Sequence, residues 1–194
     1  MNDAHAELCS SADWIEYLSN EVISPLTSGL DLGTEVLELG PGPGAATRWL
    51  ADHVKHLTCL ESDPDAASRL AERFANRNVE VVVGDAAAIA FPESSFDAVC
   101  CFTMLHHVQT TRQQNDLLAG ALRVLREGGV FVGSDSLASD GLHHFHEGDT
   151  YNPIEPSSFL TRLQTIGFRK ITLIVDDDLK FTACKLGARA ECDE

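Results

Sequence analysis

The sequence predicts an open α/β sheet of seven strands, mostly parallel, with helices on both faces and one antiparallel strand near its carboxyl-terminal end. Two observations carry this prediction. From residue 34 onward, short apolar runs alternate with amphipathic stretches, the pattern of a parallel sheet that is buried on both faces. Near the chain end, only a few acidic residues separate two apolar runs, so those two strands must pair antiparallel.

The individual elements follow from periodicity and from start and stop signals. The first 30 residues form a helical stretch, because Trp14, Leu18 and Val22 share one broad face after polar Ser10 and Ser11. Pro25 should kink or end this helix. The predicted strands are 35–39, 56–60, 79–83, 96–102, 129–133, 169–175 and 179–185, and the predicted helices are 45–54, 64–76, 111–126 and 156–165.

We expect one domain over residues 1–194. Within it, a helical cover at 1–30 precedes a core at 34–135, a loop at 139–156, and a C-terminal helix and hairpin at 157–186. The six cysteines form no CxxC pair and are expected to be free thiols. Cys100 and Cys101 are adjacent on a strand, so their side chains should point to opposite faces.

The charge balance narrows the class of partner. The 194 residues contain 14 Lys and Arg against 30 Asp and Glu, a formal net charge of −16. Such a surface repels a phosphate backbone, so no nucleic acid is expected as a partner. No apolar run approaches the ~20 residues that span a bilayer, and the first residues lack the basic and apolar regions of a signal peptide. We therefore expect a cytoplasmic protein with no membrane partner.

A glycine-rich turn is the strongest local signal. A buried strand ending at Leu39 enters the turn Gly40-Pro41-Gly42-Pro43-Gly44, which opens a helix. Glycines there let a nucleotide-like ligand lie against main-chain N–H groups. The turn satisfies GxGxx(G/A) with Ala45, and Glu61 stands about 20 residues after Gly40, where a ribose-binding carboxylate belongs in a dinucleotide fold. At this point NAD stays open beside other adenosine cofactors.

Further motifs resemble those of the class I S-adenosylmethionine-dependent methyltransferases of the small-molecule type, over about residues 34–185. The segments 38–44 and 61–63 are similar to that family's E/DxGxGxG motif and to its acidic motif. Residues 82–99 resemble its GDA…SFDxV stretch, and 102–108 its segment after the fourth strand. Residues 125–129 resemble an LxPGG turn in which Arg126-Glu127 replaces the usual proline. The resemblance implies a Rossmann-like fold.

The resemblance also implies S-adenosylmethionine as the cofactor and S-adenosylhomocysteine as the product. By it, Glu38 anchors the methionine amino group, Glu61 accepts from the ribose hydroxyls, and Asp85 accepts from the adenine amino group. The segment after the fourth strand lies beside the methionine and the transferring methyl. The implied cofactor-binding residues are Glu38, Gly40, Pro41, Gly42, Gly44, Glu61, Ser62, Asp85, Ala86, Phe102, Thr103 and His107.

Methyl transfer from a sulfonium is an in-line displacement, so alignment and exclusion of water matter most and no metal is expected. A hydroxyl or protonated amine acceptor would need a nearby base. The candidates are His107, His143 and His146, with His106 and His144 beside them, although packing or cofactor contact suits His107 equally. The run from His143 to Glu147 has residues that converge on metals, but a polar substrate loop is the favoured interpretation.

The predicted cover contains aromatic residues suited to an acceptor site. Trp14 and Tyr17 share a face of the first helix, and Tyr151 lies in the loop after the fifth strand. Ordinary packing on the core is the other interpretation of the first two. The loop is short, which favours a small molecule as substrate. The sequence has no (N/D)PP(Y/F) after the fourth strand, which argues against exocyclic amino groups of bases as acceptors.

Three functions remain. The favoured one is a methyltransferase that acts on a small molecule. The second is a non-catalytic S-adenosylmethionine-binding protein on the same fold, since a fold does not guarantee activity. The third, an NAD-dependent oxidoreductase, needs a hydride-side proton donor such as a Tyr/Lys pair, and no such motif accompanies Tyr17 or Tyr151. The acceptor atom and the oligomeric state stay open.

Overall fold

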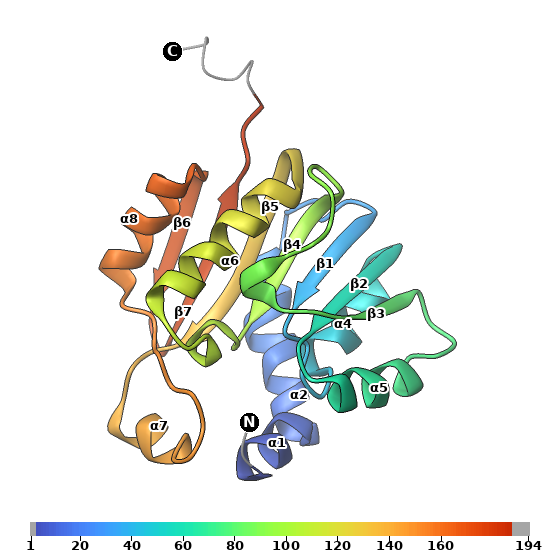
Figure 1. Ribbon diagram of the computed structural model, residues 1–194, viewed down its shortest axis with the longest axis vertical. Coiled ribbons are helices and arrows are strands. Elements are labelled where there is room, and N and C mark those ends of the chain that lie inside the picture. Colours follow the sequence, from blue (N-terminus) through green and yellow to red (C-terminus); the bar gives the residue numbers. More distant parts are fainter. Residues whose placement is uncertain (1–2, 188–194) are drawn as a thin grey trace.

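The computed structural model describes the backbone of residues 3–187 and the side chains of residues 7–187, and it contains the predicted seven-stranded sheet (Figure 1). The strand order is β3-β2-β1-β4-β5-β7-β6. Strand β7 runs antiparallel to both neighbours, and the remaining pairs are parallel. The strands are β1 (Glu35–Leu39), β2 (His56–Glu61), β3 (Val79–Val83), β4 (Phe96–Phe102), β5 (Leu125–Ser136), β6 (Arg169–Val175) and β7 (Asp178–Cys184). The predicted fold class is confirmed.

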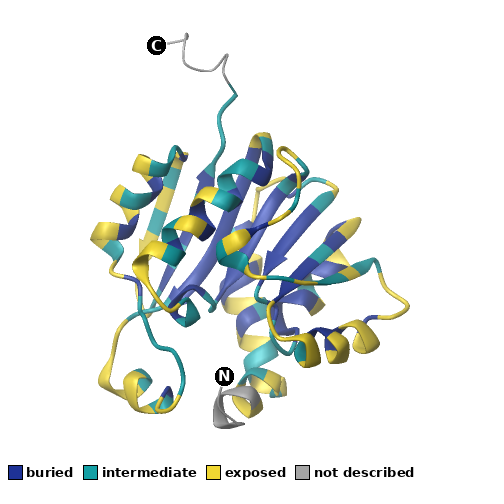
Figure 2. Cartoon of the chain, in the orientation of Figure 1, coloured by how far each residue is buried: buried dark blue, intermediate teal, exposed yellow. Residues whose placement is uncertain are grey.

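Helices cover both faces of the sheet and enclose two apolar layers (Figure 2). On one face lie α4 (Ala45–His53), α5 (Pro64–Arg73) and the N-terminal helices. On the other lie α6 (Thr111–Val124) and α8 (Pro156–Ile166). Cys100 belongs to the first layer and Cys101 to the second, which confirms that adjacent side chains on β4 point to opposite faces. The strands are thus packed on both faces, and this packing fixes the positions of the loops at the strand ends.

The N-terminal segment is helical, as predicted, but it is broken more often than one proline suggests. Helix α1 (Asp3–Ser10) ends where the Ser11 hydroxyl accepts from the Trp14 N–H and caps α2 (Ala12–Tyr17). A π-helical turn, η1 (Leu18–Ile23), leads into α3 (Ser24–Thr27), which contains Pro25. Pro25 has no N–H to donate to the helical hydrogen bonds. In the π-helical turn before it, each hydrogen bond spans one residue more than in an α-helix.

Two differences from the prediction lie around β5. Helix α6 ends at Val124, and β5 runs from Leu125 to Ser136, well beyond the predicted 129–133. The register against β4 shifts there, because Gly128 adopts a φ of +82° inside the strand. The loop after β5 also contains a short helix, α7 (Asp140–Phe145), which Ser139 caps. The longer β5 carries Asp135 into the sheet.

Within the described part of the chain, no helix is both long enough and apolar enough to cross a membrane. The cysteines at positions 9, 59, 100, 101 and 184 are free thiols, as expected, and Cys192 lies outside the described residues.

Asp97 ties the start of β1 to β4 and β5. One carboxylate oxygen accepts the N–H groups of Thr34 and Glu35, both at 2.9 Å, and the other accepts from Arg126 at 2.7 Å. Partial burial raises the pKa of Asp97, but the Glu35 N–H, the Arg126 guanidinium and the Thr34 N–H outweigh burial and lower it to about 2. The charged form is therefore the one that holds these strands together.

We predict that Asp97→Ala lowers the free energy of unfolding by about 2 kcal/mol near neutral pH, because it leaves donors without a charged acceptor. The lowered pKa makes this contribution present above the ordinary value of 3.8, and it is lost as the pH falls toward about 2. Urea unfolding followed by circular dichroism measures it. Asp52→Ala, which removes an exposed ion pair with Arg77, is the control and should cost under about 1 kcal/mol. Equal losses would contradict the prediction.

Candidate functional site

The predicted site residues gather at one edge of the sheet. Strands β1 to β5 are parallel, so their carboxyl ends meet at the lower edge in Figure 1, where α2 and α7 also lie. The glycine turn follows β1, the acidic motif follows β2, and the histidine-containing turn η3 (Leu105–His107) follows β4. Open α/β sheets bind their ligands at this edge.

The glycine turn needs glycine for two different reasons. Gly40, Gly42 and Gly44 all have positive φ, at +63°, +52° and +90°. A Cβ on Gly40 would lie 2.3 Å from Cγ of Met104, so this glycine permits close packing between the turn and the segment after β4. A Cβ on Gly42 would meet nothing within 4 Å. Gly42 therefore faces open space, where a ligand can approach the main chain.

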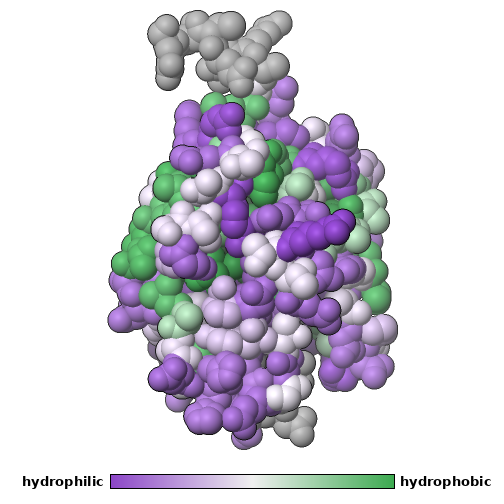
Figure 3. Space-filling view, turned by 60° about the vertical axis from the view of Figure 1, so that its left-hand side comes forward, coloured by the Kyte–Doolittle hydropathy of each residue, from purple (hydrophilic) through white to green (hydrophobic). Residues whose placement is uncertain are grey.

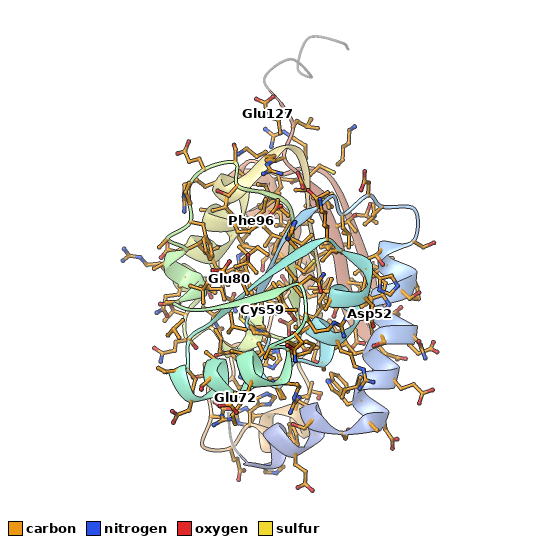
Figure 4. The ribbon with its side chains drawn as sticks, turned by 90° about the vertical axis from the view of Figure 1, so that its right-hand side faces the viewer. Asp52, Cys59, Glu72, Glu80, Phe96 and Glu127 are labelled. Carbon is orange, nitrogen blue, oxygen red and sulfur yellow. The ribbon has the colours of Figure 1, made fainter. Side chains whose placement is uncertain are left out.

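Glu38 is a carboxylate inside the protein. It is 2% exposed, and its Oε2 atom accepts from the Thr47 hydroxyl at 2.7 Å and from the Cys59 thiol at 3.3 Å. Cys59 lies in the interior between the sheet and its helices (Figure 4). Burial raises the pKa of Glu38 to about 7, against the lowering effect of the Thr47 and Cys59 hydrogen bonds. Near neutral pH the carboxyl group is thus poised between its two protonation states.

Glu61 connects the acidic motif to the glycine turn. It is 7% exposed, and its Oε2 accepts the Gly42 N–H at 3.1 Å. Its Oε1 accepts the Asp63 N–H at 3.0 Å and the Ser62 hydroxyl at 3.4 Å. A carboxylate has about four acceptor positions, so Glu61 can take a further donor while these bonds hold it in place.

The remaining predicted cofactor residues surround the same edge. Asp85 is exposed after β3 and caps the short helix η2 (Ala86–Ala88) through the Ala87 N–H at 2.8 Å. Phe102 is buried at the end of β4. Thr103 has a φ of +49°, and its N–H donates to the Ser134 carbonyl at 2.8 Å. This left-handed residue turns the chain from β4 toward η3.

The structure brings some of the predicted histidines together and separates others. The rings of His106 and His107 lie 4.1 Å apart between centroids, and those of His107 and His146 lie 5.2 Å apart. His106 and His146 are each 3% exposed, whereas His143 and His144 are exposed on α7. His106, His107 and His146 thus form a histidine cluster.

Of the predicted acceptor-site aromatics, only Tyr151 is placed by its ring contacts at the histidine cluster. Its ring stacks on His146 at 4.7 Å between centroids. Tyr17 instead donates a hydrogen bond to Asp178 in the β6–β7 hairpin at 3.0 Å, and burial together with this aspartate raises its pKa to about 12. Trp14 packs on Tyr17 and on the apolar layer beneath α4. Trp14 thus has the packing contacts of the second interpretation, whereas Tyr17 is 39% exposed and is held by Asp178.

Sequence reasoning missed the residues that hold the histidine cluster. Asp135 is fully buried and accepts from His106 Nδ1 at 2.5 Å and from the His106 N–H at 3.2 Å. Asn152 donates its N–H to the His106 carbonyl, and Gln114 bonds to carbonyls of both Leu105 and Asn152. A carboxylate at the end of a buried strand was the one available signal for Asp135. The amides carry no recognisable motif.

The sheet order, with Glu38 inside β1, the glycine turn after β1 and Glu61 at the end of β2, defines the class of protein, an S-adenosylmethionine-dependent methyltransferase fold. A family model described as a methyltransferase domain matches residues 37–133, which is half of the chain. The chain therefore belongs to this family, and the predicted cofactor, S-adenosylmethionine, is confirmed with it.

Curated relatives with different acceptors share parts of the sequence. Over 58 residues the chain is 48% identical to a probable ribosomal RNA small subunit methyltransferase A of Methanothermobacter thermautotrophicus, covering 30% of this chain and 21% of that protein. Over 107 residues it is 34% identical to a demethylmenaquinone methyltransferase of Tropheryma whipplei, covering 54% and 42%. The matches thus span less than half the length of these curated relatives.

A solved structure shows the same fold over most of the chain. Phosphoethanolamine N-methyltransferase 2 of Haemonchus contortus, in complex with S-adenosyl-L-methionine, superposes with a TM-score of 0.75 at 15% identity. The match covers 94% of this chain and 57% of that one.

We predict that Glu38→Gln removes a pH-dependent loss of stability. Because the folded pKa is raised from 4.5 to about 7, the unfolded chain ionises first as the pH rises. The free energy of unfolding should therefore fall between these values, by on the order of 3 kcal/mol at most, and stay low above them. The free energy of unfolding of Glu38→Gln should match that of the parent chain near pH 5. Near pH 8 it should exceed that of the parent chain by on the order of 3 kcal/mol at most, the loss that the parent chain suffers between the two pKa values.

Urea unfolding of the cofactor-free protein at a series of pH values measures this difference. Glu80→Gln, at an exposed carboxylate on β3, is the matched control and should keep the slope of the parent chain. A Glu38→Gln variant with the same slope as the parent chain would show that Glu38 titrates normally.

Proposed function

We propose that the protein transfers a methyl group from S-adenosylmethionine to a small-molecule acceptor by in-line displacement. The observation that carries this proposal is the contact between Gly40 and Met104. It sets the glycine turn directly against the segment that ends in His106 and His107, so a cofactor on the turn would present its methyl group toward the histidine cluster. Cofactor and acceptor would then meet at one edge of the sheet.

The cofactor end of this proposal assigns roles to polar groups already held in place. Glu38 receives the methionine amino group, since it lies buried at the end of β1 with its Oε2 held by two donors. Glu61 receives the ribose hydroxyls. Asp85 and the Ala86 N–H bind the adenine. The other residues proposed to contact the cofactor are Gly40, Pro41, Gly42, Gly44, Ser62, Phe102, Thr103 and His107.

The acceptor end favours a small molecule. The net charge of −16 opposes a polyphosphate partner, and the surface toward the α7 end of the molecule is mostly hydrophilic (Figure 3). The segment over this end, residues 139–154, is short and is tied to η3 through Asn152. The relative named for ribosomal RNA shares only 58 aligned residues with this chain. We place Tyr151, His107 and His146 at the acceptor, and we assign Trp14 and Tyr17 to the helical cover.

We predict that cofactor binding depends on Glu61. Calorimetric titration with S-adenosylmethionine, S-adenosylhomocysteine and NAD should show micromolar binding of the two sulfur compounds and none of NAD. Glu61→Gln should weaken that binding roughly 10- to 100-fold, because a charge-assisted acceptor for the ribose is lost, at about 1.4 kcal/mol per tenfold. Glu80→Gln on the neighbouring strand is the control. Binding of NAD alone would overturn the proposal.

We predict turnover with small acceptors. Release of S-adenosylhomocysteine should be detectable in a screen of hydroxylated, amine-bearing and enolisable compounds, with short RNA duplexes and hairpins as the comparison set. Methylation of RNA but of no small molecule would overturn the proposed acceptor class. Tight cofactor binding with no turnover on either set would favour a non-catalytic binding protein.

A further inference from the structure

The histidine cluster joins two segments of the chain that lie far apart in sequence. His106 and His107 come from η3 after β4, and His146 directly follows α7. One ligand nitrogen from each ring lies within 4.8 Å of the other two. The convergence comes from tertiary structure, because 38 residues separate His107 from His146 in the sequence. Three imidazole nitrogens at such distances could together bind one metal ion.

Two of these rings are oriented by oxygen acceptors at Nδ1. His106 Nδ1 faces Asp135 Oδ1 at 2.5 Å, and His146 Nδ1 faces the Leu142 carbonyl oxygen at 2.6 Å. A carboxylate and a carbonyl only accept, so each Nδ1 carries the proton. Nε2 is then the nitrogen whose lone pair suits a metal ion. Metal-binding histidines are held in this way, with the second ring N–H on a carboxylate or main-chain carbonyl.

We propose that His106, His107 and His146 bind one divalent transition-metal ion of the Zn²⁺ or Co²⁺ kind. Imidazole nitrogen is a preferred ligand for these ions. In a tetrahedral site with metal–nitrogen bonds of about 2.0–2.1 Å, the ligand atoms stand roughly 3.3 Å apart, so atoms that now lie within 4.8 Å of one another must close by up to about 1.5 Å. His107, whose side chain is 23% exposed, can approach the other two rings by rotating, and small shifts of the His106 and His146 rings complete the closure. Three protein nitrogens leave the fourth position for water or substrate.

The charges around the cluster favour a cation. Asp135 is buried against His106, and Asp149 Oδ2 lies 4.0 Å from His107 Nδ1. The two carboxylates offset the charge of a divalent ion, and the protein as a whole carries −16. An anion at this place would face both carboxylates. The electrostatics therefore favours a metal ion over a phosphate or carboxylate ligand.

This proposal differs from the expectation that no metal is involved. It also differs from a metal site made by the local run from His143 to Glu147. Of the residues from His143 to Glu147, only His146 joins the cluster. His144 is 81% exposed and pairs with Glu147 at 2.7 Å. His144 therefore provides a matched control, since it is a histidine on α7 that belongs to neither the cluster nor the proposed cofactor site.

The use of the metal rests on the proposed function, whereas metal binding itself does not. An acceptor hydroxyl that takes the open coordination position would lose its proton to water more readily, because the metal stabilises the oxyanion. The oxygen would then form its bond to the methyl carbon as the carbon–sulfur bond breaks, which leaves S-adenosylhomocysteine. A histidine base is not needed in that case.

The test is a Co²⁺ titration of the full chain, without an affinity tag and after chelator treatment, followed by visible absorption and by Zn²⁺ competition. We expect one Co²⁺ per chain, with the band lost when Zn²⁺ displaces it. His107→Gln and His146→Gln should weaken binding by at least tenfold, and Asp135→Asn by roughly 10- to 100-fold through loss of the outer carboxylate. His144→Gln should bind as the parent chain does.

Circular dichroism and urea unfolding of every variant separate a lost metal ligand from a lost fold. S-adenosylhomocysteine titration adds a second check for every variant except His107→Gln, which removes a proposed cofactor contact. The proposal is overturned if the parent chain shows no stoichiometric Co²⁺ or Zn²⁺ binding, or if His107→Gln and His146→Gln bind as tightly as His144→Gln. A parent chain that binds Co²⁺ but neither sulfur cofactor keeps the metal site and loses the proposed function. A parent chain that binds the sulfur cofactors but no metal ion keeps the proposed function and loses the metal site.

Discussion

The tight approach of Met104 to Gly40 is the constraint on which the arrangement of the site depends. Gly40 leaves the central strand β1 with a left-handed φ, and Met104 occupies the volume that a Cβ would need. A side chain at this position would push apart the turn after β1 and the segment after β4. The turn also donates the Gly40 N–H to the Leu60 carbonyl of β2. Three strand ends are thereby fixed relative to one another before any ligand arrives.

Glu38 shows that the same edge is not built for stability alone. A carboxyl group with a pKa near 7 loses hydration that it would keep in the unfolded chain, and a neutral side chain of the same shape avoids that loss. The Thr47 hydroxyl and the Cys59 thiol reduce the penalty without removing it. Such a residue is consistent with a ligand whose positive group supplies the missing partner. Perturbed carboxylates of this kind cluster at functional sites.

The parts of the structure that the sequence predicted are those that depend on neighbouring residues in the chain. Alternating apolar runs located all seven strands, and the short acidic connection at 176–178 predicted the antiparallel pairing of β6 and β7. The strand ends were less accurate, since Leu125 and Asp135 extend β5 in both directions through pairing with β4 and β7. Pairing partners are tertiary information and leave no local pattern.

The histidines illustrate the same limit more sharply. The local run at 143–147 contains residue types that bind metals, but only His146, which follows α7, meets His106 and His107, while His144 pairs with Glu147. Asp135 joins them because β5 lies beside β4, with Ser134 opposite Phe102. Sequence spacing can identify ligands on one helix or hairpin. It cannot identify a cluster that exists only because two parallel strands are adjacent in the sheet.

The family match and the proposed acceptor residues occupy different parts of the chain. The family match ends at residue 133, before Asp135, α7, His146 and Tyr151. The matched part therefore holds the glycine turn, Glu38 on β1 and Glu61 at the end of β2. The proteins named for ribosomal RNA and for demethylmenaquinone each match this chain over less than half of their own length. Similarity over residues 37–133 therefore bears on the cofactor. The chemistry of the acceptor has to be argued from the side chains at the end of β5 and after it.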